Sequence, residues 1–292
     1  MRSRRALLYV PADDERKINK AASLPVDCVI LDLEDGVAPG RKDAARESAV
    51  RALQRMDFSN AERLVRINPV DRQPGLQDLE AILPARPDGI LLPKIDSADT
   101  VHRVSETIAR MEKVRGWPAG GIALIVIAET ARAILRLEAI CSAEERVQAV
   151  IFGAEDLAAD IGAVRSAGGM EVFTARSLVV LNAAAAGIQA LDVVNVNYRD
   201  LEALYADARQ AAGMGFAGKQ IIHPAQIDPV QRAFTPSEDE VRQAQELIRA
   251  FEASVANGKG AFGLDGRMVD MPVIRRAENV LSRAASAGRR DR

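Results

Sequence analysis

The chain has 292 residues, 48% of them hydrophobic and 27% charged, so it can bury a sizeable core beneath a well-solvated surface. Its formal net charge is −2, which gives no indication of nucleic acid or an anionic membrane as a partner. No apolar run reaches the length expected of a signal peptide or a membrane span. The two cysteines, Cys28 and Cys141, lie beside apolar runs and are expected to be buried thiols. The sequence therefore predicts a soluble, cytoplasmic protein.

Eight short apolar runs, rich in β-branched residues, alternate with segments of helical character. The runs are residues 6–10, 28–33, 64–67, 89–92, 122–128, 149–152, 189–194 and 220–222. Several are continuous rather than alternating, as strands buried on both faces should be. The helical segments include 41–53, 98–112, 131–140, 174–186 and 200–213. We therefore expect residues 1–230 to form an α/β fold, a (β/α)8 TIM barrel. An open doubly wound sheet is the alternative, but no glycine-rich dinucleotide fingerprint follows the first strand.

The pattern changes after residue 230, where a helical extension is expected. Thr235 is predicted to be the N-cap of a helix that has Pro236 at its first position and Glu238 as the capping-box acid. This helix should end near Ala256. A glycine-rich segment follows, with a hairpin turn at residues 265–266, and a last helix should cover residues 274–287. Residues 231–292 are thus predicted to form a C-terminal helical extension and lid.

Charged or polar residues follow nearly every predicted strand, where a barrel builds its active site. These residues are Asp32, Glu34, Asp35, Arg66, Lys94, Glu129, Glu155, Asp156, Asp192, Asn195 and His223. Glu129 and Asp156 come from neighbouring strands and carry the hard oxygen ligands that Mg²⁺ prefers. Arg66 lies deep in a strand, and its planar guanidinium suits a substrate carboxylate. Any one of these residues could instead form a salt bridge at the barrel rim. The whole set is harder to explain in that way, because crowded carboxylates repel one another unless a metal is present.

Only two histidines occur, which excludes a histidine-rich zinc site. His102 falls in a helical segment and is expected to be a surface residue. His223 ends the eighth predicted strand. It is either a residue of the barrel mouth or a hydrogen-bonded structural histidine beside Pro224, and the sequence leaves both readings open.

A series of short motifs, in order from Leu8 to Ala277, resembles the citrate lyase β-subunit-like proteins. These belong to the wider HpcH/HpaI group of Mg²⁺-dependent aldolases and acyl-CoA lyases. The motifs are 9–11 (YVP), 31–37 (LDLEDGV), 65–68 (VRIN), 92–94 (LPK), 129–130 (ET), 152–156 (FGAED), 218–224 (GKQIIHP), 258–262 (GKGAF) and 268–272 (MVDMP). Each motif is weak alone, and together they are specific. The last two point to the citramalyl-CoA lyase branch.

The resemblance implies a barrel that assembles as a homotrimer and holds Mg²⁺ through Glu129 and Asp156. It implies that Arg66 contacts the substrate carboxylate. It also implies that Asp270 is the catalytic acid/base, delivered by the C-terminal lid of a neighbouring subunit. The alternative for Asp270 is that it only caps the final helix.

The resemblance also implies a binding site for a CoA thioester. It places Tyr9, Arg16 and Lys20 near the CoA part, with the backbone around Ile222 and His223 lining the thioester pocket. Position 16 is Arg where Lys is expected, which keeps a positive charge for a CoA phosphate. Asn197 stands where an acid is common, and no role is assigned to it.

The expected activity is Mg²⁺-dependent cleavage of a β-hydroxyacyl-CoA, citramalyl-CoA or malyl-CoA, into acetyl-CoA and an oxo acid, pyruvate or glyoxylate. One alternative keeps the fold and changes the partner: the β subunit of a citrate lyase complex, acting on an acyl-carrier-protein thioester. The other alternative is a barrel that has lost catalysis and serves as a binding subunit. The complete set of Arg66, Glu129, Asp156 and Asp270 argues against that last reading.

Overall fold

The structure is a computed structural model that describes residues 2–166, 168–256, 261–264 and 267–288. The chain divides into two compact units. One is Arg4–Gln231, and the other is Arg232–Arg292 with Met1–Ser3. Within the described part of the chain, no helix is both long and apolar enough to cross a membrane.

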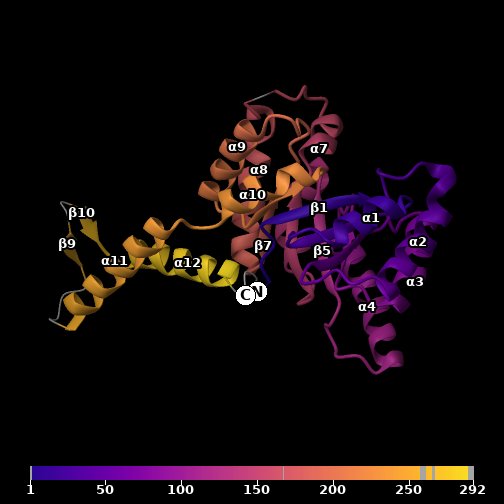
Figure 1. Ribbon diagram of the computed structural model, residues 1–292, viewed down its shortest axis with the longest axis horizontal. Helices are drawn as coiled ribbons and strands as arrows, with labels where there is room; N and C mark the ends of the chain where they lie inside the picture. The colour runs from indigo at the N-terminus through magenta and orange to yellow at the C-terminus, as the bar shows by residue number, and fades with distance from the viewer. Residues whose placement is uncertain (1, 167, 257–260, 265–266, 289–292) are drawn as a thin grey trace. The chain divides into compact units, whose positions relative to one another are not determined.

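The first unit is a closed barrel of eight parallel strands, as predicted (Figure 1). The strands are β1 (Ala6–Pro11), β2 (Cys28–Asp32), β3 (Glu62–Arg66), β4 (Gly89–Leu92), β5 (Ala123–Ala128), β6 (Val147–Phe152), β7 (Gln189–Asp192) and β8 (Gly218–Ile221). Each pairs with the next in chain order, and β1 pairs with β8 to close the barrel. Every predicted apolar run overlaps one strand, because strands covered on both faces need apolar side chains on both faces.

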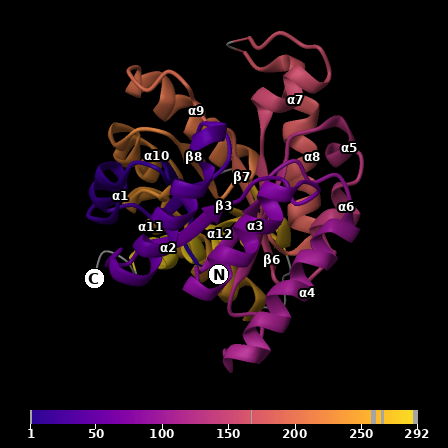
Figure 2. The same ribbon diagram turned by 90° about the vertical axis from the view of Figure 1, so that its right-hand side faces the viewer.

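Helices follow the strands and surround them (Figures 1 and 2). They are α1 (Glu15–Ala22), α2 (Lys42–Arg55), α3 (Gln73–Ile82), α4 (Ala98–Arg115), α5 (Ala131–Ile134), α6 (Leu137–Cys141), α7 (Ala154–Asp160), α8 (Met170–Ala186), α9 (Leu201–Met214) and α10 (Ile227–Phe234). The single helix predicted over 131–140 is two short ones. The break leaves Leu135 exposed to solvent, while Ile134 and Leu137 on either side of it are buried.

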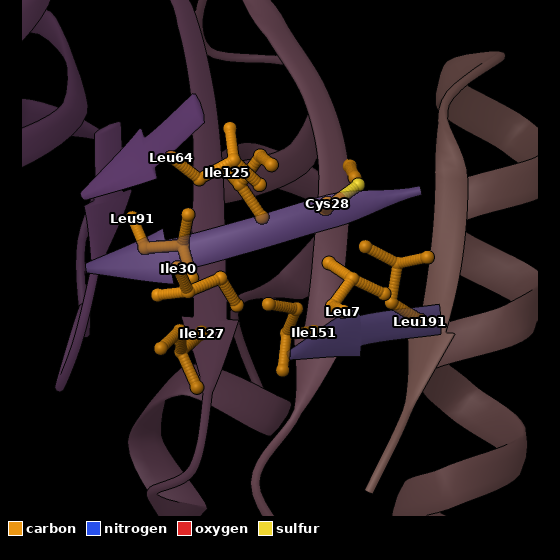
Figure 3. Packing of buried hydrophobic residues seen from close by; sticks show 10 residues of the cluster. Leu7, Cys28, Ile30, Leu64, Leu91, Ile125, Ile127, Ile151 and Leu191 are labelled. Atoms are coloured by element: carbon orange, nitrogen blue, oxygen red, sulfur yellow. The ribbon is translucent and has the colours of Figure 1, made fainter. Parts of the chain in front are cut away.

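The barrel interior is aliphatic, in keeping with an aromatic content of only 4%. Figure 3 shows part of this core, and its members come from seven of the eight strands. They are Leu7, Cys28, Ile30, Leu64, Leu91, Ile125, Ile127, Ala149, Ile151 and Leu191. Both cysteines are buried thiols, as predicted, and burial raises the pKa of the Cys141 thiol to about 12.

A buried arginine closes the end of the barrel where the strands begin. Arg4 donates from Nε and Nη2 to the two carboxylate oxygens of Glu62, each at 2.7 Å, and also to the side-chain oxygens of Gln148 and Gln189. Gly218 of β8 lies against this residue, since a Cβ there would stand 1.7 Å from the Arg4 carbonyl oxygen. Because these polar side chains fill the end where the strands begin, the site is expected at the opposite end, where the strands finish.

Asp192 belongs to a buried ionic cluster between strands β7 and β8 and helices α8 and α9. Lys219 Nζ lies 2.5 Å from Asp192 and 2.8 Å from Asp207, and Arg176 also pairs with Asp192. Although burial opposes it, these two cations lower the pKa of Asp192. The expectation that Asp192 joins a convergent site is therefore wrong. Its carboxylate is paired with cations inside the fold.

The second unit contains α11 (Glu238–Ala256), the antiparallel strands β9 (Phe262–Leu264) and β10 (Arg267–Val269), and α12 (Met271–Gly288). Helices α11 and α12 pack against each other. The predicted turn at 265–266 lies outside the described residues.

The predicted cap of the first extension helix is wrong by two residues. Ser237 Oγ accepts the N–H of Glu240, and Glu240 accepts the N–H of Ser237, which forms the capping box. Thr235 instead donates its N–H to Arg232, in the turn that ends α10. The sequence holds two overlapping capping patterns. The one that forms places three acids, Glu238, Asp239 and Glu240, in the first turn of the helix.

Candidate active site

Arg66, the last residue of β3, is held in place by carboxylates from the neighbouring strand. Its Nε and Nη2 donate to the two oxygens of Asp32, each at 2.7 Å, and Nη1 lies 2.8 Å from Glu34 Oε2. The guanidinium also lies over the Tyr9 ring, 4.8 Å from its centroid. Burial opposes its charge, but the hydrogen bonds that it donates to Asp32, together with the nearby acidic groups, raise the pKa of Arg66. N–H groups on Nη1 and Nη2 remain for a ligand.

Asp32 organises the loop that follows β2. Besides Arg66, it accepts the backbone N–H of Glu34 and that of Gly36, both at 2.9 Å. A Cβ at position 36 would stand 2.5 Å from Asp32 Oδ2, so only glycine allows this close approach. Sequence reasoning placed Asp32 near the site but missed its role, because the pairing of Asp32 with Arg66 depends on the register between β2 and β3.

The structure brings the two predicted metal ligands, Glu129 and Asp156, close enough to interact electrostatically. Glu129 follows β5 and is only 3% exposed, whereas Asp156 lies in the first turn of α7, after β6. Burial, followed by the negative charge of Asp156, raises the pKa of Glu129 to about 8. Gly153 makes room for this carboxylate, because a Cβ there would stand 2.5 Å from the Glu129 Cβ. In the described chain, no three His, Cys, Asp or Glu side chains gather as a metal cage.

Lys94 connects these carboxylates with Glu34. Its backbone N–H donates to Glu129 Oε1 at 2.7 Å, and its Nζ donates to Glu34 Oε1 at 3.0 Å. The same Nζ lies 3.9 Å from Asp156 Oδ1. Sequence reasoning noted Lys94 after the fourth strand but gave it no function.

A cavity of about 790 Å³ opens beside Arg66, within the size range of small-molecule sites. Its lining includes all six residues expected to contact substrate: Tyr9, Arg16, Lys20, Arg66, Ile222 and His223. Arg16, Lys17 and Lys20 of α1 give one wall a positive charge. Glu129 and Asp156 are not among the lining residues, so the cavity accounts for the predicted thioester side of the site and not for the metal side.

Gln220 of β8 is a polar residue of the site that sequence reasoning missed. Its Nε2 donates to the carbonyls of Phe152 and Asp192, both at 3.2 Å, and its Oε1 accepts the Tyr9 hydroxyl at 2.8 Å. The two carbonyls fix the orientation of the amide, so Tyr9 is a donor in this contact. Burial raises the pKa of Tyr9, which keeps the hydroxyl neutral. The sequence feature that could have indicated this role is a glutamine directly before the apolar residues 221–222 at the end of a predicted strand.

His223 combines both roles that the sequence left open. Its Nδ1 accepts the N–H of Ala225 at 3.1 Å, and its ring stacks on Tyr198 with centroids 4.8 Å apart. It also lines the cavity with Ile222. The backbone N–H groups of Ile222 and His223 both donate to Gln226 Oε1, which holds this turn in place.

Asp270 lies in the second unit, between β10 and α12. Its carboxylate accepts the N–H of Val273 at 3.4 Å, and its carbonyl accepts the N–H of Ile274 at 3.1 Å. This is the capping geometry of the structural alternative. The catalytic role of Asp270 stays a prediction.

Comparison with known proteins identifies the family. The sequence model of the HpcH/HpaI aldolase/citrate lyase family matches residues 5–224, which cover the barrel and its site. The chain belongs to this family. The mitochondrial citramalyl-CoA lyase of Rattus norvegicus is 41% identical over 293 residues, covering 97% of this chain and 86% of the relative. The citrate lyase subunit beta of Escherichia coli K12 is 37% identical over 290 residues, covering 99% and 96%.

The chain is also similar to a solved structure that contains ligands. Protein CitE of Mycobacterium tuberculosis, in complex with magnesium, acetoacetate and coenzyme A, aligns with a TM-score of 0.81 at 34% identity. The alignment covers 97% of this chain and 98% of that one. The resemblance predicted from the motifs is confirmed, and the family is one of lyases.

Proposed function

We propose that the protein is a Mg²⁺-dependent lyase that cleaves a short β-hydroxyacyl-CoA, citramalyl-CoA in the first place, into acetyl-CoA and an oxo acid. The observation that carries this proposal is one arrangement at the barrel mouth. An anchored arginine lines a cavity with a basic wall and also acts electrostatically on Glu129, which interacts with Asp156. The relatives that act on citramalyl-CoA and citrate support the same reaction class.

The residues fit magnesium by the chemistry of their donors. Glu129 is buried beside the charge of Asp156, an arrangement that raises its pKa and that a bound cation would relieve. Two protein carboxylates match the usual share of a magnesium shell, which leaves the other positions to water and substrate. When bound there, the ion would polarise the substrate and lower the pKa of its hydroxyl group.

The chain's own groups would act at both ends of the bond that breaks. The hydroxyl gives its proton to water and becomes a carbonyl, and the electron pair of the C–C bond passes to the acetyl-CoA carbon. The free N–H groups of Arg66 would bind the carboxylate and offset charge as the carbonyl forms. Asp270 would give the acetyl-CoA carbanion its proton. The lid would exclude water while the carbanion exists.

The basic wall favours a CoA ester. Arg16 and Lys20 are exposed side chains on α1 beside the cavity, and CoA phosphates would pair with them. In this proposal the protein is a homotrimer, with Asp270 supplied by a neighbouring subunit. The alternative partner is an acyl-carrier protein. The similarity to the citrate lyase subunit beta supports this alternative.

A panel of thioesters tests the substrate. Purified protein with Mg²⁺ would be given citramalyl-CoA, malyl-CoA, and citryl thioesters of CoA and of a carrier protein, with products followed by mass spectrometry. We expect pyruvate and acetyl-CoA from citramalyl-CoA at the highest kcat/KM. Preference for the carrier-protein thioester would move the assignment to a citrate lyase complex. Release of free CoA with the acid intact would show hydrolysis and reject the lyase.

A further inference from the structure

Lys94 adopts a backbone conformation that lysine rarely takes. Its φ is +51°, in the left-handed region that glycine occupies at little cost. A non-glycine residue held there is strained, and such strain persists where the surrounding structure fixes it, often at functional sites. This conformation directs the N–H of Lys94 to Glu129 while its ammonium group reaches Glu34. Both ends of the residue are thus used within the site.

Glu34 is a third carboxylate beside the proposed metal ligands. It is only 3% exposed, and its charge contributes to the raised pKa of Glu129. Its Oε1 accepts a hydrogen bond from Lys94, whereas its Oε2 faces Arg66 Nη1 at 2.8 Å and accepts no hydrogen bond from the described residues. The Lys94 ammonium lies between this carboxylate and Asp156. Glu34 therefore lies close to the proposed metal ligands, where its carboxylate is held by the hydrogen bond from Lys94 and by the charge of Arg66.

We propose that Lys94 is a positioning residue that keeps Glu34 off the metal, so that the ion is bound by Glu129 and Asp156 alone. This inference rests on the proposed function, since it takes those two residues as magnesium ligands. A third carboxylate would fill a coordination position that the substrate needs, and its negative charge would repel the substrate carboxylate. In this proposal, Lys94 lowers the Mg²⁺ affinity of the site and leaves a coordination position open for the substrate.

The test measures Mg²⁺ affinity by calorimetry on the full-length protein, without ester. Lys94→Met keeps the side-chain length but removes the ammonium group, so Glu34 Oε1 loses its hydrogen bond and becomes free to reach the ion, and one repulsive charge is lost. We expect Mg²⁺ to bind about 10-fold more tightly, because affinity rises with the number of charged ligands. Lys94→Arg retains a cation for Glu34 and should stay near the wild-type Kd. Lys94→Met/Glu34→Gln should lose most of the gain.

The outcomes separate this inference from the proposed function. Unchanged or weaker Mg²⁺ binding by folded Lys94→Met would overturn the role of Lys94. Tight binding that persists in Lys94→Met/Glu34→Gln would also overturn it, because the gain would then come from charge alone. If the wild type binds no Mg²⁺, or if Glu129→Gln binds it equally well, the proposed metal site itself is wrong. Should Lys94→Met fail to fold, Lys94→Gln provides the same comparison with a polar side chain.

Discussion

Replacing Arg66 with lysine is expected to lower kcat/KM by about 30- to 1000-fold, which corresponds to roughly 2–4 kcal/mol of lost transition-state stabilisation. Lysine keeps the charge but has no planar fork, so it cannot reproduce both 2.7 Å hydrogen bonds to Asp32. Without that anchor, the cation no longer presents fixed N–H groups to the substrate. The loss should fall on kcat/KM measured with the preferred CoA ester.

The matched control for this variant is Arg63→Lys in the same strand. Arg63 also pairs with an aspartate, Asp88, through Nε at 3.1 Å, but it lies nearer the start of β3 and away from the site. We expect that change to leave kcat/KM within a factor of about two, since partly exposed pairs contribute little. Near-normal kcat/KM in Arg66→Lys would show that the substrate carboxylate binds elsewhere.

Asp270→Asn is expected to remove most C–C cleavage while leaving Mg²⁺ and CoA ester binding intact. Asparagine caps a helix as well as aspartate does, so α12 should keep its first turn and the melting temperature should not change. What asparagine cannot do is transfer a proton. The variant should therefore also lose exchange of the acetyl-CoA methyl protons with solvent, measured by NMR in D2O. Retained cleavage would limit Asp270 to its capping role.

Mixing two inactive variants tests whether Asp270 acts in a neighbouring subunit. Asp270→Asn supplies an intact metal pocket, and Glu129→Gln supplies an intact acid. If subunits exchange in a homotrimer, some mixed sites should contain both groups and recover part of the activity. Loss of activity in Asp270→Asn with no recovery on mixing would keep the acid but place its action within its own subunit.

The barrel could be predicted from the sequence because its strands are buried on both faces and so appear as uninterrupted apolar runs. Once the strands were known, the residues that follow them could be assigned to one site, because parallel strands all finish at one end of a barrel. Glu129 and Asp156, which follow the adjacent strands β5 and β6, are the best example. Helix boundaries were less certain, because overlapping capping signals such as those at Thr235 and Ser237 are separated only by tertiary context.

The partners of the site residues could not be predicted, because they depend on register and on contacts far apart in the chain. Tyr9 and Gln220 meet across 211 positions, and Lys94 reaches Glu34 across 60. For Asp192, the position in the sequence suggested a role in the site that the structure does not support. Its place at the end of a strand suggested the site, but its side chain pairs with Lys219 and Arg176 instead. Sequence position gives the end of the strand, and the direction of the side chain follows from packing.

The most direct test of the central claim is metal removal during cleavage of citramalyl-CoA. The protein would be treated with EDTA, freed of chelator, and assayed for pyruvate and acetyl-CoA before and after Mg²⁺ is restored. We expect turnover to disappear when Mg²⁺ is removed, because no cation at Glu129 and Asp156 would then polarise the carboxylate and hydroxyl of the substrate. Turnover should return when Mg²⁺ is restored. Full turnover in metal-free buffer would contradict the account.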